Sequence, residues 1–293
     1  MRRFLPGAAT LPVVALCFNA FTWGVSWWPL RRLEALGLHP LWATVIVYAL
    51  AVAVITAWRP RAWLELLRSP VLWVLVLASG TTNASFNWAV TIGDVVRVVL
   101  LFYLMPLWAV LLARWLLNER LTRLAALRVA LALAGAAIVL WPAGGGLPWP
   151  ATLAEGLAVL GGFSFALNNV MLRREAARDD AARALAMFLG GMLVAGALAL
   201  TLALQAAVPW PPAPAAGWAL GAAGLALWFL AGNLSLQYGA ARLSANATAV
   251  VMVTEVVFAS VSAVWLGAGT LSPQLLAGGG LIVGAALLAA RQR

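Results

Sequence analysis

The segment NASFNW at residues 83–88 returns 150 residues later as NLSLQY at residues 233–238. At the same offset, the apolar run that leads to Trp115 matches the run that leads to Trp265. A sequence that matches itself at one fixed offset is built from copies of one structural unit. The repeat therefore predicts a chain of two related halves.

The composition indicates that the solvent of this chain is lipid. Of its 293 residues, 64% are hydrophobic and 10% are charged, and the mean hydropathy is +0.96. A soluble domain carries about a quarter of its residues charged. All 19 basic residues are arginines, which lie in the short gaps between apolar blocks or near the ends of these blocks. This distribution argues against a basic face for nucleic acid.

The sequence offers no set of metal ligands. It contains one cysteine, Cys17, and one histidine, His39. We therefore expect no disulfide framework, no metal site and no cofactor.

Ten apolar blocks are long enough to cross a bilayer as helices. We place them at residues 10–29, 40–57, 71–91, 95–115, 124–141, 153–172, 184–206, 215–237, 245–266 and 273–290. The predicted fold is an all-α integral membrane protein of ten transmembrane helices, with one five-helix repeat in residues 1–142 and another in residues 153–293. Because five is odd, the second copy enters the membrane from the opposite side, and the repeat is inverted.

The arginines predict the orientation of the chain. With a cytoplasmic N-terminus, 16 of the 19 basic residues lie on the cytoplasmic side, and Arg31, Arg32 and Arg97 lie outside. Arginine is enriched in cytoplasmic loops, so we expect both termini in the cytoplasm. Asp94 and Arg97, three residues apart at the outer end of the fourth span, are expected to pair with each other.

Three motifs resemble the EamA branch of the drug/metabolite transporter superfamily. They are NERLT at residues 118–122, TEV at residues 254–256 and VVRVVLLFYLMPLW at residues 95–108. The third is similar to the YddG-type exporters of aromatic and neutral amino acids. Val256 and Gly269 depart from the family pattern, which has proline and glutamate there. The resemblance implies a multi-pass exporter of the bacterial inner membrane, with a central cavity in a ten-helix bundle.

Polar side chains recur at helical spacing inside the predicted spans. Asn83 and Asn87 lie four residues apart in the third span, Asn233 and Gln237 repeat them in the eighth, and Asn168 lies on a polar face of the sixth. Carboxamides both donate and accept hydrogen bonds, which suits the carboxylate and ammonium of an amino acid. The alternative is that they hold packed helices together. Both interpretations stay open for Asn87 and Gln237, and helix packing is favoured for Asn83 and Asn233.

Glu255 is a carboxylate near the middle of a predicted span. An acid at this depth is a candidate for carrying a coupling proton or for binding the ammonium of a substrate. A structural hydrogen bond to a neighbouring helix is the equal alternative. At the offset of 150 residues its counterpart is Met105, which is predicted to face the cavity if Glu255 does.

Trp23, Phe86 and Tyr103 lie deep in the predicted spans. They are candidates for a wall against an apolar or aromatic substrate side chain, with ordinary helix packing as the alternative. Pro106 lies in mid-span, where it removes a backbone hydrogen bond and predicts a hinge.

These patterns predict a secondary exporter of neutral and aromatic amino acids and related metabolites that works by alternating access. The alternative is efflux of drugs or cationic toxins, with Glu255 binding the cation. No span carries paired acids or a Ser/His set, so we expect no enzyme. The expected partners are the small-molecule substrate, the lipid bilayer and a coupling proton, without nucleic acid, and the protein is expected to be a monomer or a homodimer.

Overall fold

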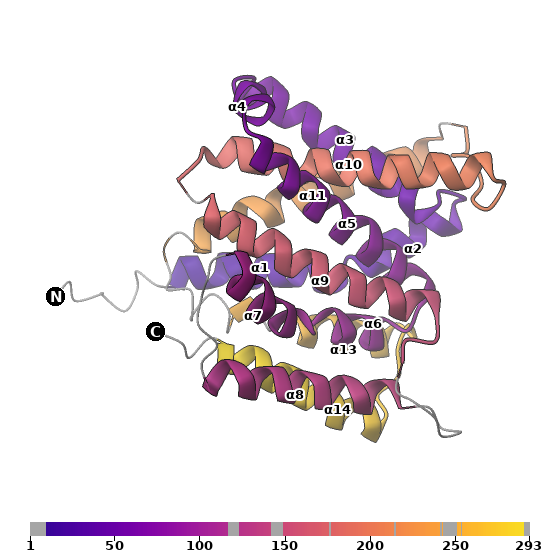
Figure 1. Ribbon diagram of the computed structural model, residues 1–293. Coiled ribbons are helices and arrows are strands. Elements are labelled where there is room, and N and C mark those ends of the chain that lie inside the picture. Colours follow the sequence, from indigo (N-terminus) through magenta and orange to yellow (C-terminus); the bar gives the residue numbers. More distant parts are fainter. Residues whose placement is uncertain are drawn as a thin grey trace.

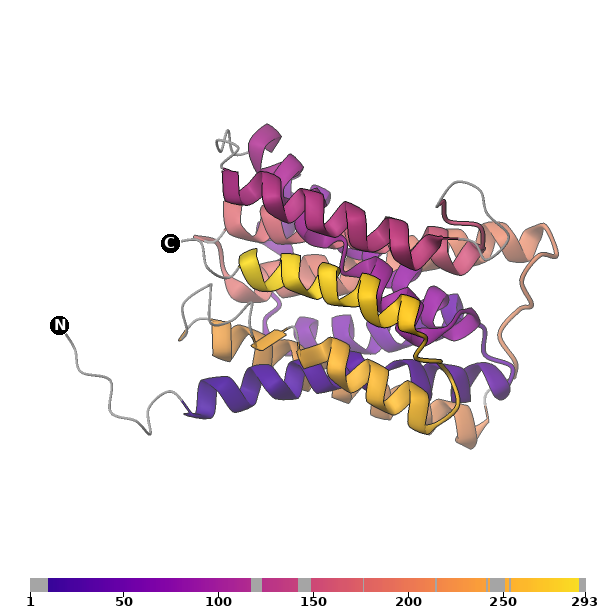
Figure 2. The same cartoon turned by 90° about the horizontal axis from the view of Figure 1, so that it is seen from below.

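The computed structural model describes an α-helical bundle (Figure 1). It describes residues 10–116, 123–141, 149–175, 177–213, 215–240, 242, 251–252 and 254–289. No strand occurs among these residues. Most of the helices run roughly along one common direction, and α1 begins at the same end of the bundle at which α14 ends (Figures 1 and 2).

The helices follow the apolar blocks of the sequence. Their bounds are α1 Thr10–Val25, α2 Trp27–Ala35, α3 Pro40–Trp58, α4 Ala62–Arg68, α5 Pro70–Ile92, α6 Val95–Phe102, α7 Met105–Leu116, α8 Arg123–Leu140, α9 Leu153–Arg174, α10 Asp180–Leu204, α11 Ala216–Ala240, α13 Thr254–Trp265 and α14 Pro273–Ala289. Each predicted span therefore contains a described helix or, for the first and fourth spans, a pair of consecutive helices. The short helix α4 was not predicted.

The helices identify a multi-pass membrane protein. Among the described residues, six helices are long and apolar enough to cross a membrane. The pair α4 and α5, bent by 102°, makes a seventh candidate if it counts as one span. Three shorter apolar helices lie within α8, α13 and α14, so the total of ten spans stays a prediction.

Helices of the first half pack mainly on helices of the second half. The most extensive contacts join α5 to α9 and α10, α8 to α14, α3 to α10, and α1 to α11 and α13. Two pairs correspond under exchange of the predicted halves: α5 with α9 corresponds to α11 with α1, and α7 with α9 corresponds to α13 with α1. The two predicted repeats are therefore interlocked rather than separate bodies.

The crossing of α5 and α10 brings two backbones into direct contact. A Cβ on Gly190 would lie 2.1 Å from the carbonyl oxygen of Val76, and one on Gly80 would lie 2.4 Å from the carbonyl oxygen of Gly190. Real Cβ atoms do not approach so closely, so both positions require glycine. The close approach fixes α5, which carries much of the site described below, against the second half.

Two tryptophans at helix ends are strongly exposed. Trp115 is 77% exposed at the end of α7, and Trp265 is 84% exposed at the end of α13. They are the pair that the 150-residue offset matches. Indole rings favour the boundary between lipid headgroups and acyl chains, which is where helix ends meet the membrane surface.

Candidate functional site

The fourth predicted span is broken into two helices near its middle. Helix α6 ends at Phe102 and α7 begins at Met105, so Tyr103 and Leu104 form the break. Pro106 has no N–H and cannot bond to the carbonyl oxygen of Phe102, four residues earlier. The backbone break occurs where the proline predicted one, while the side chain of Pro106 lies outside the described residues and its role as a hinge stays a prediction.

Helix α9 packs directly on this break. A Cβ on Gly162 would lie 2.5 Å from the carbonyl oxygen of Phe102, so the two backbones touch there. This carbonyl is the one that receives no helical hydrogen bond from Pro106. Gly161, the preceding residue, faces the ring of Phe102. A larger residue at position 162 would push α9 away from the break.

Tyr103 connects the break to the second half of the chain. Its hydroxyl oxygen lies 3.0 Å from Oε2 of Glu255 and 3.0 Å from the carbonyl oxygen of Met252. A hydroxyl group has one proton, so it donates to one of these acceptors at a time. Both side chains are buried, with 2% of Tyr103 and 7% of Glu255 exposed. Two residues that the sequence singled out separately thus meet in one contact between the halves.

Glu255 lies in the first turn of α13 and is held by α1 as well. A Cβ on Gly24 of α1 would lie 2.9 Å from the carbonyl oxygen of Glu255, so α1 and α13 touch at this residue. Within the described part of the chain, Glu255 makes no ion pair. Its described side-chain partner is the neutral hydroxyl of Tyr103, which leaves the carboxylate open to a proton or a cation.

Met105 lies two residues beyond Tyr103 and is half-buried. It packs against the cluster formed by Leu112, Ala166 and Val170 and against the main core. Its position at the start of α7 places it next to the break. That it faces a cavity together with Glu255 stays a prediction.

Asn83 and Asn87 lie on α5 and contact α3. The hydroxyl of Tyr48 donates to Oδ1 of Asn83 at 2.5 Å, and Nδ2 of Asn87 donates to Oγ1 of Thr44 at 3.0 Å. Nδ2 of Asn83 also donates to the carbonyl oxygen of Ser79 at 2.8 Å. The bonds with Tyr48 and Thr44 join two helices of the same half, which is the geometry of helix packing. Tyr48 was not singled out from the sequence, although it lies in an apolar span where a hydroxyl needs a partner.

Buried oxygens without partners accompany these carboxamides. Among the described residues, Oδ1 of Asn87, Oδ1 of Asn168 and Oδ1 of Asn19 have no hydrogen-bond partner. Asn168 is 2% exposed in α9, and Asn19 donates through Nδ2 to the carbonyl oxygen of Gly232 at 2.8 Å. Unsatisfied buried acceptors are costly, so these atoms are candidates for binding water or substrate.

The second-half carboxamides are described less fully. Asn233 is half-buried in α11, next to the carbonyl that Asn19 contacts. The side chain of Gln237 lies outside the described residues. The predicted match of these two residues to Asn83 and Asn87 stays a prediction.

The aromatic residues predicted for the site lie in two separate groups of rings in contact. Trp23 stacks on Phe229 with centroids 4.7 Å apart, and Phe229 contacts Tyr48 at 6.1 Å. Phe86 contacts Phe102 at 4.8 Å, which precedes Tyr103. The first group ends at Tyr48, which contacts Asn83, and the second ends at the break between α6 and α7. Aromatic rings therefore lie next to Asn83 and next to Tyr103.

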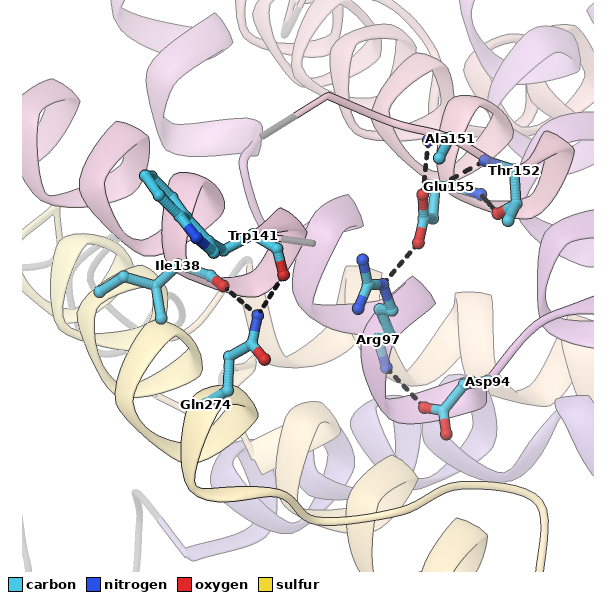
Figure 3. Close-up of polar contacts among 8 residues, drawn as sticks. All are labelled: Asp94, Arg97, Ile138, Trp141, Ala151, Thr152, Glu155 and Gln274. Carbon is cyan, nitrogen blue, oxygen red and sulfur yellow. Dashed lines mark hydrogen bonds and ion pairs between the residues drawn. The ribbon is translucent and has the colours of Figure 1, made fainter. Parts of the chain in front are cut away.

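The end of the bundle at which α6 and α9 begin is called here the arginine-poor end, and Figure 3 shows polar contacts there. Asp94 caps α6 there: its Oδ1 accepts from the backbone N–H of Arg97 at 2.9 Å, and its Oδ2 accepts from the backbone N–H of Thr270 at 3.0 Å. The guanidinium of Arg97 pairs instead with Glu155 of α9, with Nε 2.6 Å from Oε1. The expected pairing of Asp94 with the Arg97 side chain is thus replaced by a link between the halves.

Two further side chains close helix ends at the arginine-poor end. Arg31 donates to the carbonyl oxygens of Val90 and Gly93 at 3.1 and 2.5 Å, and so caps the end of α5. Gln274 donates to the carbonyl oxygens of Ile138 and Trp141 at the end of α8 (Figure 3). Cations and donors at a helix C-terminus satisfy its free carbonyls.

The opposite, arginine-rich end has its own link between the halves. Arg178, in the turn between α9 and α10, donates through Nη1 to Oγ of Ser69 at 2.8 Å and lies 3.7 Å from Glu65 of α4. Its hydrogen bond to Glu175 raises the pKa of Arg178 further above its ordinary value. Charged contacts thus connect α9 to the first half at both of its ends.

The first half of the chain is similar to a known transporter family. Residues 10–141 match the model of the EamA-like transporter family. The protein named Uncharacterized transporter PA0485, from Pseudomonas aeruginosa, is 41% identical over 97 residues, which cover 31% of this chain and 32% of that relative. The match thus spans about a third of the relative's length.

A solved structure entitled "Crystal structure of protein" shares the fold. The likeness covers 95% of this chain and 96% of that one, with a TM-score of 0.59 and 21% sequence identity. The first half of this chain is therefore similar to the EamA-like transporter family, and nearly the whole chain shares its fold with the solved structure.

Proposed function

We propose that this protein is a secondary transporter that exports neutral and aromatic amino acids and related metabolites by alternating access. The membrane is the bacterial inner membrane, both chain termini face the cytoplasm, and the protein is no enzyme. The sequence contains no Walker A motif, so ATP is not the direct energy source. A monomer or a homodimer carries the activity.

The contact between Tyr103 and Glu255 carries this proposal. It joins a broken helix of the first half to α13 of the second half. Transporters built from inverted repeats bind substrate where discontinuous helices meet between the repeats. Buried ionisable groups at such depths take part in proton or substrate binding. Glu255 therefore binds the ammonium group of the substrate or a coupling proton.

The arrangement of the halves supports alternating access. Their helix pairs match under exchange of the halves, as two states related by a twofold axis require. Charged links occur at both ends, Arg97 with Glu155 and Arg178 with Glu65. Opening one end while the other stays closed requires that one such link breaks at a time.

The aromatic contacts support the substrate class. Rings that reach both the helix break and the Asn83 contact provide apolar surface for a large side chain, and carboxamide oxygens without partners accept from an ammonium group. The second candidate function is efflux of cationic drugs or toxins, because Glu255 makes no ion pair among the described residues.

A counterflow experiment tests both functions. Purified protein in liposomes is loaded with one unlabelled amino acid, and entry of the same labelled compound is measured, compound by compound. We expect exchange of neutral and aromatic amino acids, reduced in Glu255→Gln and unchanged in the control Asp180→Asn, whose carboxylate is exposed at the start of α10. Exchange of organic cations alone, wholly dependent on Glu255, would establish the second function and reject the first.

A further inference from the structure

A recess lies at the arginine-poor end, away from the Tyr103 contact. It has a volume of about 520 Å³ and is lined by the start of α6, with Asp94 and Arg97, and by the start of α9, with Thr152, Leu153 and Glu155. Figure 3 shows the charged side chains of this recess between the two helices. The recess is thus bounded by both halves of the chain.

The cation of this recess is incompletely bonded. Nε of Arg97 is 2.6 Å from Glu155, yet it makes no hydrogen bond of acceptable angle, and its side chain is 30% exposed. Within the described part of the chain, neither Nη nitrogen of Arg97 donates to an acceptor. A guanidinium group binds a carboxylate best through two parallel N–H bonds, and Arg97 has these donors available.

The anion of the recess is held in place independently of Arg97. Oε2 of Glu155 accepts from the backbone N–H groups of Ala151 and Thr152 at 2.8 and 3.3 Å, within the capping box of α9. Its Oε1 has Arg97 as its partner among the described residues. Loss of the contact with Arg97 would therefore leave Glu155 in position with one oxygen free.

We infer that this recess is a second binding site, which takes the zwitterionic head group of an α-amino acid. The carboxylate of the ligand binds the guanidinium of Arg97, and its ammonium binds Oε1 of Glu155. One ion pair within the protein is replaced by two between protein and ligand, so binding costs no unpaired charge. Because Arg97 and Glu155 belong to different halves, the ligand also separates the link that holds this end closed.

This second site is separate from the site of the proposed function. Its role in the cell rests on the proposed function, the export of amino acids. An exported amino acid would occupy it on leaving the central site, and an amino acid outside would reach it without crossing the membrane. The competing explanation is an ordinary structural ion pair. The two differ in what they predict for ligands that carry only one of the two charges.

Protection of an introduced cysteine tests the site in the full-length protein in detergent. Leu153 is 57% exposed and lines the recess, so Leu153→Cys, made together with Cys17→Ser, gives a reporter for N-ethylmaleimide. The matched control is Leu36→Cys in the same background, 53% exposed between α2 and α3. The probes are L-phenylalanine, L-phenylalaninamide without the carboxylate, and 3-phenylpropionate without the ammonium.

We expect L-phenylalanine to slow labelling of Leu153→Cys, and each single-charge probe to act at much higher concentration. At four times its Kd, a ligand leaves about one fifth of the sites free, so the rate falls about fivefold. Labelling of Leu36→Cys should not change. Equal protection by all three probes, or no protection, would overturn the inference.

Two charge variants test the contacts themselves. With Glu155→Gln, which keeps the capping box, 3-phenylpropionate should protect as well as L-phenylalanine. With Arg97→Gln, L-phenylalaninamide should protect the cysteine as well as L-phenylalanine does. A structural ion pair would give no such exchange of preference. The labelling requires no transport, so protection without counterflow would count against the proposed function alone, and counterflow without protection against this site alone.

Discussion

Tyr103 and Tyr48 are both buried tyrosines whose hydroxyl groups contact a polar side chain on another helix, but the partners belong to different parts of the fold. Tyr103 contacts Glu255 of the second half, whereas Tyr48 donates to Asn83 within the first half. We expect the contact between α3 and α5 to persist through the cycle, because both helices pack on the same helix, α10. We expect the contact between Tyr103 and Glu255 to form and break, because it lies at the break between α6 and α7.

The comparison therefore separates function from stability. The contact between Tyr103 and Glu255 should control transport, because its energy differs between the states. The contacts of Asn83 and Asn87 should control the free energy of unfolding, because they are present in every folded state. Variants at the two places should give opposite results in the two measurements.

The largest effect is expected for Glu255→Gln. Glutamine keeps the shape and the hydrogen bond to Tyr103 but cannot bind or release a proton or pair with an ammonium group. Counterflow should fall at least about tenfold, equivalent to roughly 1.4 kcal/mol, and the remaining transport should not vary with pH. The measurement is initial rate against pH in proteoliposomes. An unchanged pH profile would exclude proton relay by Glu255.

The next effect is expected in the first-half contacts, for Asn83→Leu. The substitution leaves the hydroxyl of Tyr48 buried without an acceptor, which costs about 1–3 kcal/mol. Thermal unfolding in detergent should show the loss, while transport per folded molecule should stay near that of the natural protein. A fall in transport without a loss of stability would show that Asn83 contacts substrate. The contact of Tyr48 with Asn83 would then not be a purely stabilising one.

The smallest effect is expected for the matched pair Tyr103→Phe and Tyr48→Phe. Each removes one hydroxyl and changes little volume. Tyr103→Phe should slow transport about threefold, since a net hydrogen bond contributes about 1 kcal/mol or less. Tyr48→Phe should lower stability by a similar free energy and leave the rate unchanged. Equal effects of the two variants on transport would show that the contact of Tyr48 also changes during the cycle.

The sequence predicts the helices well because apolar blocks between arginine-rich or proline-rich gaps have few other structures available in lipid. The break near Pro106 was also predictable, since proline lacks the N–H that a continuous helix requires. Helix α4 was missed because seven residues with Glu65 and Arg68 do not form an apolar block.

The partners of the polar side chains were harder to predict. Asn83 and Asn87 were found from their spacing, but spacing on one helix does not show which neighbour faces it, and Tyr48 of α3 was therefore missed. The pairing of Arg97 with Glu155 failed for a similar reason. Sequence distance favoured Asp94, whose oxygens instead accept from backbone N–H groups, while the interlocked halves bring Glu155 within reach.

The two exposed tryptophans make the contact between the halves sensitive to the thickness of the membrane. Trp115 ends α7 at the arginine-rich end, and Trp265 ends α13 at the other, so each ring marks the depth of one leaflet. The same two helices begin beside Tyr103 and at Glu255. A mismatch between helix length and bilayer thickness costs fractions of a kcal/mol per Å. A mismatch of a few Å therefore costs on the order of the free energy that one hydrogen bond contributes, about 1 kcal/mol. A thicker bilayer therefore pulls α7 and α13 in opposite directions along the membrane normal, and strains the contact at which the halves meet.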